Sequence, residues 1–182
     1  MSKKILITYF SHGGENLIDD ELVDLGDQGN TMLASKELQK QLIAKGALAP
    51  CFEIKPLFDY PKSYDETVAR SHEEHAAGAR PLIVEGPDNF DDFDIVFVGY
   101  PNWWGTCPTP VMTFLDNHNF KGKIVIPFVT HGGQIFMYSI EEIKQEIPAA
   151  TIKEGFAIAA AYISSCSKVI SNYLEKNSDL FN

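Results

Sequence analysis

The chain alternates between two kinds of segment along its whole length. Apolar runs with β-branched residues predict strands at 4–10, 49–55, 94–100 and 123–130, and a final strand within 151–161. Segments of helical character predict helices at 31–45, 64–77, 109–117, 139–146 and 163–176. Apolar strands that alternate with helices favour a parallel sheet covered on both faces. We therefore expect an α/β fold of three layers around a doubly wound, five-stranded parallel sheet, in a single domain spanning 1–182.

Two local signals mark where helices end and begin. Gly46 follows the first predicted helix and is expected to end it. Ser139 and Glu142 have the spacing of a capping box, so Ser139 is expected as the N-cap of the fourth helix.

The balance of charges and the cysteine count exclude several classes of protein. There are 15 Lys and Arg residues against 25 Asp and Glu, which gives a net charge of −10. Nucleic acids and anionic membranes attract basic surfaces, so we expect neither as a partner, whereas a basic protein remains compatible. Three distant cysteines predict no disulfide framework and no metal site. No membrane span and no signal peptide are indicated, so we expect a cytoplasmic protein.

The loops after the first, third and fourth strands are the expected ligand site, because ligands of open parallel sheets bind beyond the carboxyl ends of the strands. The first of these loops is long. It carries an acidic insertion at about 13–29, with six acidic and no basic residues. Ser11 precedes the insertion, and Asn30 and Thr31 follow it at the start of a helix, whose N–H groups attract anions. These neutral donors could hold a phosphate; the alternative is a surface loop with an Asn cap.

The loop after the third strand places Trp103 and Trp104 side by side. Adjacent indoles at a strand end predict a stacking platform for a flat ligand, although both rings could instead pack beneath the loop. In the loop after the fourth strand, Gly132 and Gly133 allow a close approach of backbone to ligand, and His131 could donate a hydrogen bond. The alternative there is a simple turn. Together the three loops suit an aromatic mononucleotide.

Three stretches of sequence resemble the flavodoxin-like family, in particular bacterial single-domain members. These stretches are KILITYFS with the later GNT, then GYPNWWGTCPTPV, then GKIVIPFVTHGG. The resemblance covers essentially the whole chain, and GYPxWWG and THGG are its specific motifs. It implies FMN as the cofactor and the strand order 2-1-3-4-5, for which flavodoxin is itself the standard example. The family's compact Ser/Thr-x-Thr-Gly-x-Thr loop is split here by the acidic insertion.

The same resemblance implies a set of cofactor-binding residues. The phosphate would be held by Ser11, Asn30 and Thr31, with backbone from His12 and Gly13. The isoalloxazine would lie along Pro101, Asn102, Trp103, Trp104, Gly105 and Thr106. A third wall would consist of Thr130, His131, Gly132 and Gly133. No catalytic side chain is expected.

The implied function follows from how a protein tunes a flavin. Stacked aromatic rings, a dry pocket and a net negative charge all disfavour the anionic, fully reduced ring. We expect an electron-transfer protein that cycles FMN between semiquinone and hydroquinone, with a reductase or acceptor protein as its redox partner. An FMN-dependent NAD(P)H:quinone-type oxidoreductase is the alternative, and a non-redox binding module on the same fold is a third. The sequence leaves the oligomeric state open.

Overall fold

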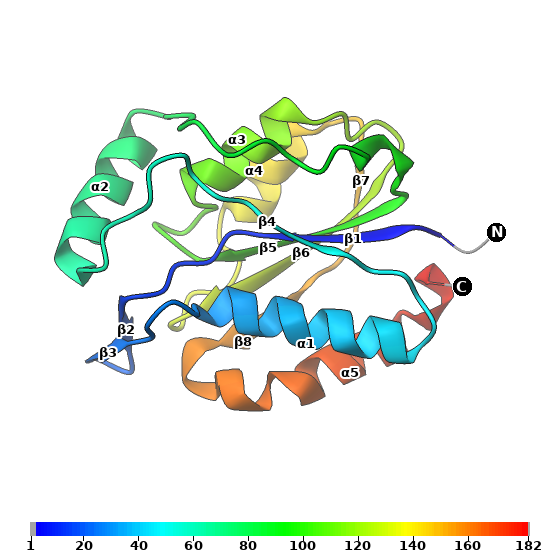
Figure 1. The fold of residues 1–182 in the computed structure, drawn as a ribbon, viewed down its shortest axis with the longest axis horizontal. Coiled ribbons are helices and arrows are strands. Elements are labelled where there is room, and N and C mark those ends of the chain that lie inside the picture. Colours follow the sequence, from blue (N-terminus) through cyan, green and yellow to red (C-terminus); the bar gives the residue numbers. More distant parts are fainter. Residues whose placement is uncertain (1–2, 182) are drawn as a thin grey trace.

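The computed structural model describes residues 3–181 and has three layers (Figure 1). Parallel strands form the central sheet, whose order is β4-β1-β5-β6-β7, with β8 also paired to β6. These strands are β1 (Ile5–Tyr9), β4 (Cys51–Glu53), β5 (Ile95–Pro101), β6 (Ile124–His131), β7 (Thr151–Ile152) and β8 (Phe156–Ala159). The expected α/β fold and the order 2-1-3-4-5 are confirmed.

Helices cover both faces of the sheet. They are α1 (Asn30–Ala44), α2 (Tyr64–Ala76), α3 (Thr109–Asn117), α4 (Ser139–Glu146) and α5 (Cys166–Lys176). Figure 1 shows α1 and α5 on one face and α3 and α4 on the other. A hydrophobic core lies on each face of the sheet, and alternate residues of β1 point into the two cores. Ile5 and Ile7 pack with α1 and α5, and Leu6 packs with α3 and α4. None of the helices within 3–181 has the length and apolarity needed to cross a membrane.

The ends of two helices differ from the prediction. Ser139 is the first residue of α4 and not its N-cap, and no capping box forms. Its buried hydroxyl instead donates to the carbonyl oxygen of Phe136 and accepts a hydrogen bond from Tyr100. The last helix was expected from 163, but a 3-10 segment occupies Ala160–Ser165 and α5 starts at Cys166.

The fifth position of the sheet is divided between two short strands. β7 pairs with Ile124 and Val125, and β8 pairs with the far half of β6. Pro127 lies between these pairings and has no N–H to donate to a neighbouring strand. Gly155 passes so close to Pro127 that a Cβ there would collide with the proline carbonyl. The stretch 151–161, which was expected to include one final strand, therefore contains two short strands, because Pro127 interrupts the ladder.

The acidic insertion folds as a β-hairpin. Its strands, β2 (Glu15–Ile18) and β3 (Glu21–Asp24), pair antiparallel outside the main sheet. Asp19 and Asp20 connect them with φ of 49° and 63°, which is the backbone of a type I′ turn. Because this turn lacks the usual glycine, the sequence predicted only a loop here.

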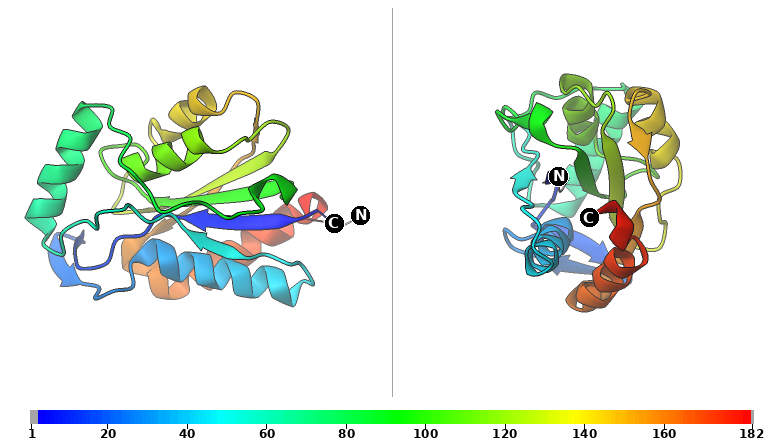
Figure 2. Two further views of the ribbon diagram at one scale, coloured as in Figure 1. Left: turned by 45° about the horizontal axis from the view of Figure 1, so that its top comes forward. Right: turned by 90° about the vertical axis from the view of Figure 1, so that its right-hand side faces the viewer.

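Helix α2 covers neither face of the sheet. Figures 1 and 2 show it beyond the carboxyl ends of the strands, next to the β2–β3 hairpin. The hairpin binds the start of this helix, since the backbone N–H of Tyr64 donates to Oε2 of Glu15 at 2.9 Å and the N–H of Glu15 donates to the carbonyl of Lys62 at 2.8 Å. The hairpin and α2 thus form one structure above the edge of the sheet where ligands were expected.

Candidate functional site

A cavity of about 360 Å³ lies at this edge, within the usual size range of small-molecule sites. The hairpin, the start of α1, α2 and the loops after β5 and β6 enclose it. The structure brings most of the predicted binding residues to it: His12, Asn30, Thr31, Pro101, Asn102, Trp103, Trp104, Thr130, His131 and Gly132. Loops that are distant in sequence therefore meet at one site, as the topology predicted.

The other predicted residues lie nearby but outside this cavity. Ser11 and Gly13 line a neighbouring cavity of about 310 Å³, to which His12 also contributes. Gly105, Thr106 and Gly133 line neither of the two. Thr106 is nevertheless notable, because its buried hydroxyl has no hydrogen-bond partner among the described residues.

The predicted set of binding residues left out two walls of the cavity and one further lining residue, Ala160. The residues concerned are Glu15, Asn16, Leu17 and Ile18 of the hairpin, Tyr64, Thr67, Val68 and Ser71 of α2, and Ala160. The hairpin was read as a loop, and α2 was read as a polar, exposed helix. The one available signal was the spacing of Thr67 and Ser71, which puts two small hydroxyl side chains on one face of an otherwise charged helix.

The start of α1 is an uncharged donor site. The first amides of a helix have no partner inside it. Here Oγ of Ser11 accepts from the N–H of Met32 at 3.0 Å, which leaves the amides of Asn30 and Thr31 for a ligand. Asn30 is buried, and its Oδ1 has no partner among residues 3–181. Gly29 precedes them, and a Cβ on it would overlap the carbonyl of His12, so only glycine fits.

Two hydrogen bonds hold the adjoining loops together. The hydroxyls of Thr31 and Thr130 lie 2.7 Å apart and connect the start of α1 to the end of β6. His131 accepts a hydrogen bond on Nδ1 from the N–H of Gly133 at 3.0 Å, and burial lowers the pKa of its ring. The loop after β6 is thus closed on itself and fastened to α1.

His12 contributes a neutral ring to the site. Its Nε2 lies 2.8 Å from the carbonyl oxygen of Pro61, an acceptor, so Nε2 carries the proton. Burial lowers the pKa of the ring below its usual value, more than the hydrogen bond to Pro61 raises it. The hydrogen-bond donors beside the start of α1 are therefore neutral near neutral pH.

Trp103 packs edge-on into an aromatic cluster. Its ring centroid lies 5.3 Å from that of Phe10, 5.1 Å from that of Tyr60 and 5.8 Å from that of His12. Such T-shaped contacts fix the plane of the ring. Trp103 therefore forms a rigid wall of the cavity.

Trp104 is held differently. Trp103 and Thr106 form a bridge closed by Trp104 and Gly105, whose φ values of 59° and 80° make a type I′ turn. The Trp104 side chain is 45% exposed, and its Nε1–H donates to Oγ of Ser71 on α2 at 3.1 Å. The two indoles therefore separate: one packs into the protein and the other reaches across to α2.

Asn102 fastens this turn to the loop after β6. Its Nδ2 donates to the carbonyls of Gln134 and Ile135, and its Oδ1 accepts from the N–H of Gly105 at 3.0 Å. All polar atoms of this side chain are thus engaged within the protein. Its contribution to the site is to set the conformation of the loop that carries the tryptophans.

Known proteins of similar sequence and structure indicate the family of this chain. The family model described as flavodoxin matches residues 28–177. A candidate flavoprotein from Bacteroides eggerthii DSM 20697 is 28% identical, with a TM-score of 0.74 over 97% of this chain and 98% of that one. A flavoprotein in complex with FMN from Lactobacillus acidophilus NCFM is 18% identical, with a TM-score of 0.66 over 91% and 99%.

The oxidised flavodoxin 2 of Bacillus cereus is 20% identical, with a TM-score of 0.53 over 95% of this chain and 99% of that one. No curated protein matches the sequence. The family match begins at residue 28, immediately before α1, and so leaves the β2–β3 hairpin outside it. With the strand order and the position of the cavity, the match establishes that this chain belongs to the flavodoxin family.

Proposed function

We propose that the chain binds FMN in the 360 Å³ cavity and serves as a one-electron carrier between redox proteins. One observation carries this proposal: the uncompensated N-terminus of α1 opens into the same cavity that both tryptophans line. A helix N-terminus suits a phosphate, and indole rings suit a flat heteroaromatic ring. The FMN complex of the Lactobacillus relative supports the same cofactor.

The residues present fit the phosphate of FMN. The amides of Asn30 and Thr31 are free to donate, and no acidic residue occupies the first turn of α1. The side-chain amide of Asn30 is buried with an unsatisfied oxygen, which a ligand hydroxyl could satisfy.

The residues at the other end fit the ring. Bound FMN supplies one-electron chemistry. Trp103 presents a fixed aromatic surface, and Val68 of α2 adds an apolar one. The net charge of −10 opposes additional negative charge on the ligand. The chain thus favours a low potential for the last electron.

A partner protein would dock at the mouth of the cavity. Large apolar side chains are exposed there on three separate segments, including Leu17, Trp104 and Ile135. The hairpin beside them carries only acidic charge in its turn and outer strand. Apolar contacts surrounded by negative charge suit a basic reductase or acceptor.

The competing function is hydride transfer from NAD(P)H to a quinone. That reaction requires room for a second substrate against the flavin. The cavity lies near the lower end of the roughly 300–1,000 Å³ range of small-molecule sites, and α2 and Trp104 cover it, which favours the carrier.

The proposal is tested with the purified protein. We expect a yellow protein, or a colourless one that becomes yellow on addition of FMN and quenches its fluorescence. Potentiometry should then resolve two one-electron steps. A protein that takes up no FMN refutes the cofactor assignment. Rapid turnover of NADH or NADPH with a quinone, without a separate reductase, supports the oxidoreductase instead.

A further inference from the structure

Helix α2 is held over the cavity almost without apolar contacts. Of its thirteen residues, the buried ones are Thr67 and Ser71, and both line the cavity together with Val68. Most helices in proteins are stabilised by burying an apolar face. The position of α2 must therefore depend on its polar contacts.

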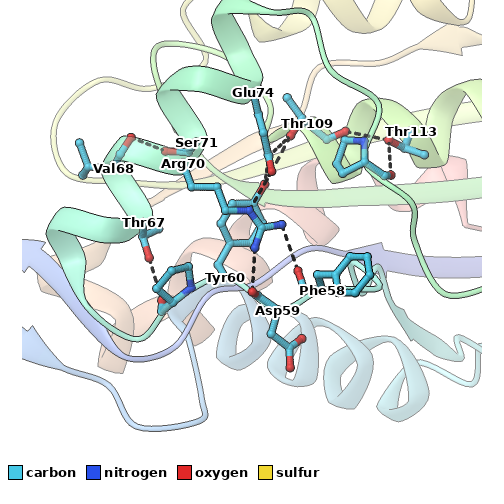
Figure 3. A network of polar contacts seen from close by, with 12 residues as sticks. Phe58, Asp59, Tyr60, Thr67, Val68, Arg70, Ser71, Glu74, Thr109 and Thr113 are labelled. Carbon is cyan, nitrogen blue, oxygen red and sulfur yellow. Dashed lines mark hydrogen bonds and ion pairs between the residues drawn. The ribbon is translucent and has the colours of Figure 1, made fainter.

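Glu74 is the centre of those contacts (Figure 3). Its Oε1 accepts from Nε of Arg70 at 2.8 Å, and its Oε2 accepts from the hydroxyls of Thr109, at 2.6 Å, and Tyr60. Burial alone would raise the pKa of this carboxyl, but the three donors bring it below its usual value. One carboxylate thus joins α2, the start of α3 and the segment before α2.

Arg70 extends the network to the backbone. It donates to the carbonyls of Asp59, at 2.7 Å, and Phe58, at 3.0 Å, while its guanidinium lies 4.0 Å from the centre of the Tyr60 ring. A guanidinium can serve all these partners at once because its five N–H groups form a planar fork. Figure 3 shows the two carbonyls and the Glu74 carboxylate arranged around it.

Each tryptophan of the cavity is one contact away from this network. The Tyr60 ring, clamped between Arg70 and Glu74, packs against Trp103 with centroids 5.1 Å apart. Ser71, next to Arg70 on α2, accepts the hydrogen bond from Trp104 at 3.1 Å. Movement of α2 would therefore change the separation of the two cavity walls and the orientation of the Trp104 indole.

We infer that Arg70 and Glu74 are positioning residues, which fix α2 and Trp104 against the Trp103 wall at the separation that a planar ligand requires. Neither side chain lines the cavity. The inference rests on the proposed function only where it concerns flavin; the effect on α2 itself is independent of any ligand.

The experiment compares Glu74→Leu and Arg70→Lys with a matched ion pair elsewhere. Glu74→Leu removes the acceptor of all three donors, and Arg70→Lys keeps the charge but loses the fork. Glu146→Leu is the control, because the Arg80–Glu146 pair has the same chemistry, a 2.8 Å separation and similar burial, and does not line the cavity. Hydrogen exchange is measured on the full-length protein without FMN, and dissociation constants are measured for FMN and riboflavin.

In the absence of ligand, we expect the amides of α2 to exchange at least about tenfold faster in Glu74→Leu, with Arg70→Lys in between and Glu146→Leu unchanged. With ligand, Glu74→Leu should raise the dissociation constants of FMN and riboflavin by the same factor, about tenfold, because α2 would lie against the ring of the proposed ligand and not against its phosphate. The midpoint potential of the bound flavin should rise as water enters.

Three results would overturn the inference: unchanged exchange in α2, unchanged flavin affinity, or a loss confined to FMN. Should Glu74→Leu not fold, Glu74→Gln and Arg70→Lys provide the same comparison, because both keep the size of the side chain. If the wild-type protein binds no flavin but α2 still exchanges faster in the variants, the proposed function fails and the role of the ion pair in positioning α2 stands.

Discussion

Two helices begin at the cavity, and the protein treats their positive ends in opposite ways. At α2, Glu15 accepts the hydrogen bond of the first amide, and Asp65 and Glu66 stand in the first turn. At α1, no acidic residue occupies the first turn, and glycine precedes it. Both ends carry the partial positive charge of a helix dipole. The anion site proposed at α1 thus depends on one helix end that is left uncompensated, with no lysine or arginine in its first turn.

The largest effect is expected when a negative charge is placed at the start of α1 as well, so that both helix ends are compensated. Asn30→Asp places a carboxylate at its start without a change in shape. Repulsion of about 4 kcal/mol between unit charges roughly 4 Å apart, in surroundings of intermediate dielectric constant, leads us to expect FMN affinity to fall by about 100-fold or more. Titration of FMN fluorescence measures it.

Two controls show whether the charge acts on the phosphate. Riboflavin, which has no phosphate, should lose far less affinity in Asn30→Asp. Asp65→Asn at the start of α2 should change the affinity for FMN and the affinity for riboflavin by no more than about twofold. An equal loss for FMN and riboflavin would mean that the phosphate does not lie at α1.

A smaller effect is expected from the hydroxyls at the two helix starts. Ser11→Ala removes the acceptor of the Met32 amide and should lower the free energy of unfolding by about 1–2 kcal/mol. Ser63, the N-cap of α2, makes no side-chain cap bond, so Ser63→Ala should stay within about 0.5 kcal/mol of wild type. Urea denaturation distinguishes the two variants, and equal losses would contradict the role of the Ser11 hydroxyl as acceptor for the Met32 amide.

The hydrogen bond between Glu15 and the first amide of α2 should contribute less to the free energy of unfolding than the Ser11 hydrogen bond, because Glu15 is exposed. Glu15→Ala is expected to reduce the free energy of unfolding by roughly 0.5–1 kcal/mol. Glu21→Ala, on the exposed second strand of the same hairpin, is the control and should have almost no effect. If Glu15→Ala also leaves stability unchanged, the hairpin does not support α2.

The mildest effect concerns pH. Because burial lowers the pKa of His12 in the folded protein, protonation is easier in the unfolded chain, and its contribution favours folding only above the usual histidine pKa. Stability should fall as pH decreases through about 6.5 and toward the lowered value. The variant His12→Gln retains a hydrogen-bond donor for the Pro61 carbonyl but has no group that titrates in this range. Its stability should therefore fall less over that pH interval. Denaturant unfolding between pH 8 and pH 5 measures the difference.

Much of the fold was predictable from local patterns. The strand that begins at Ile95 and the helix that begins at Thr109 appear where apolar runs and a proline at a helix start predict them. The loops that carry Asn30, Trp103 and Thr130 meet because parallel strands bring their carboxyl ends to one edge. These features depend on neighbours in sequence and on a general rule of topology.

Other features depend on contacts between distant segments. Pro127 divides the fifth strand only because its missing N–H faces that strand, and the order of the sheet is needed to see it. Trp103 and Trp104 are the same residue type and are adjacent in sequence. Their different environments follow from a turn with two positive φ values and from the presence of Ser71 across the cavity.

By itself, the sequence determined the layered fold, the edge of the sheet at which the cavity lies and the absence of basic side chains from the loop before α1, because periodicity and charge are local properties. Only the tertiary structure decided what covers that edge. Helix α2 has no apolar stripe to announce a packing partner, and its place is set by Arg70 and Glu74 through contacts with residues up to 35 positions away. A helix that is held by polar contacts leaves no hydrophobic pattern in the sequence, so the position of α2 follows only from the tertiary structure.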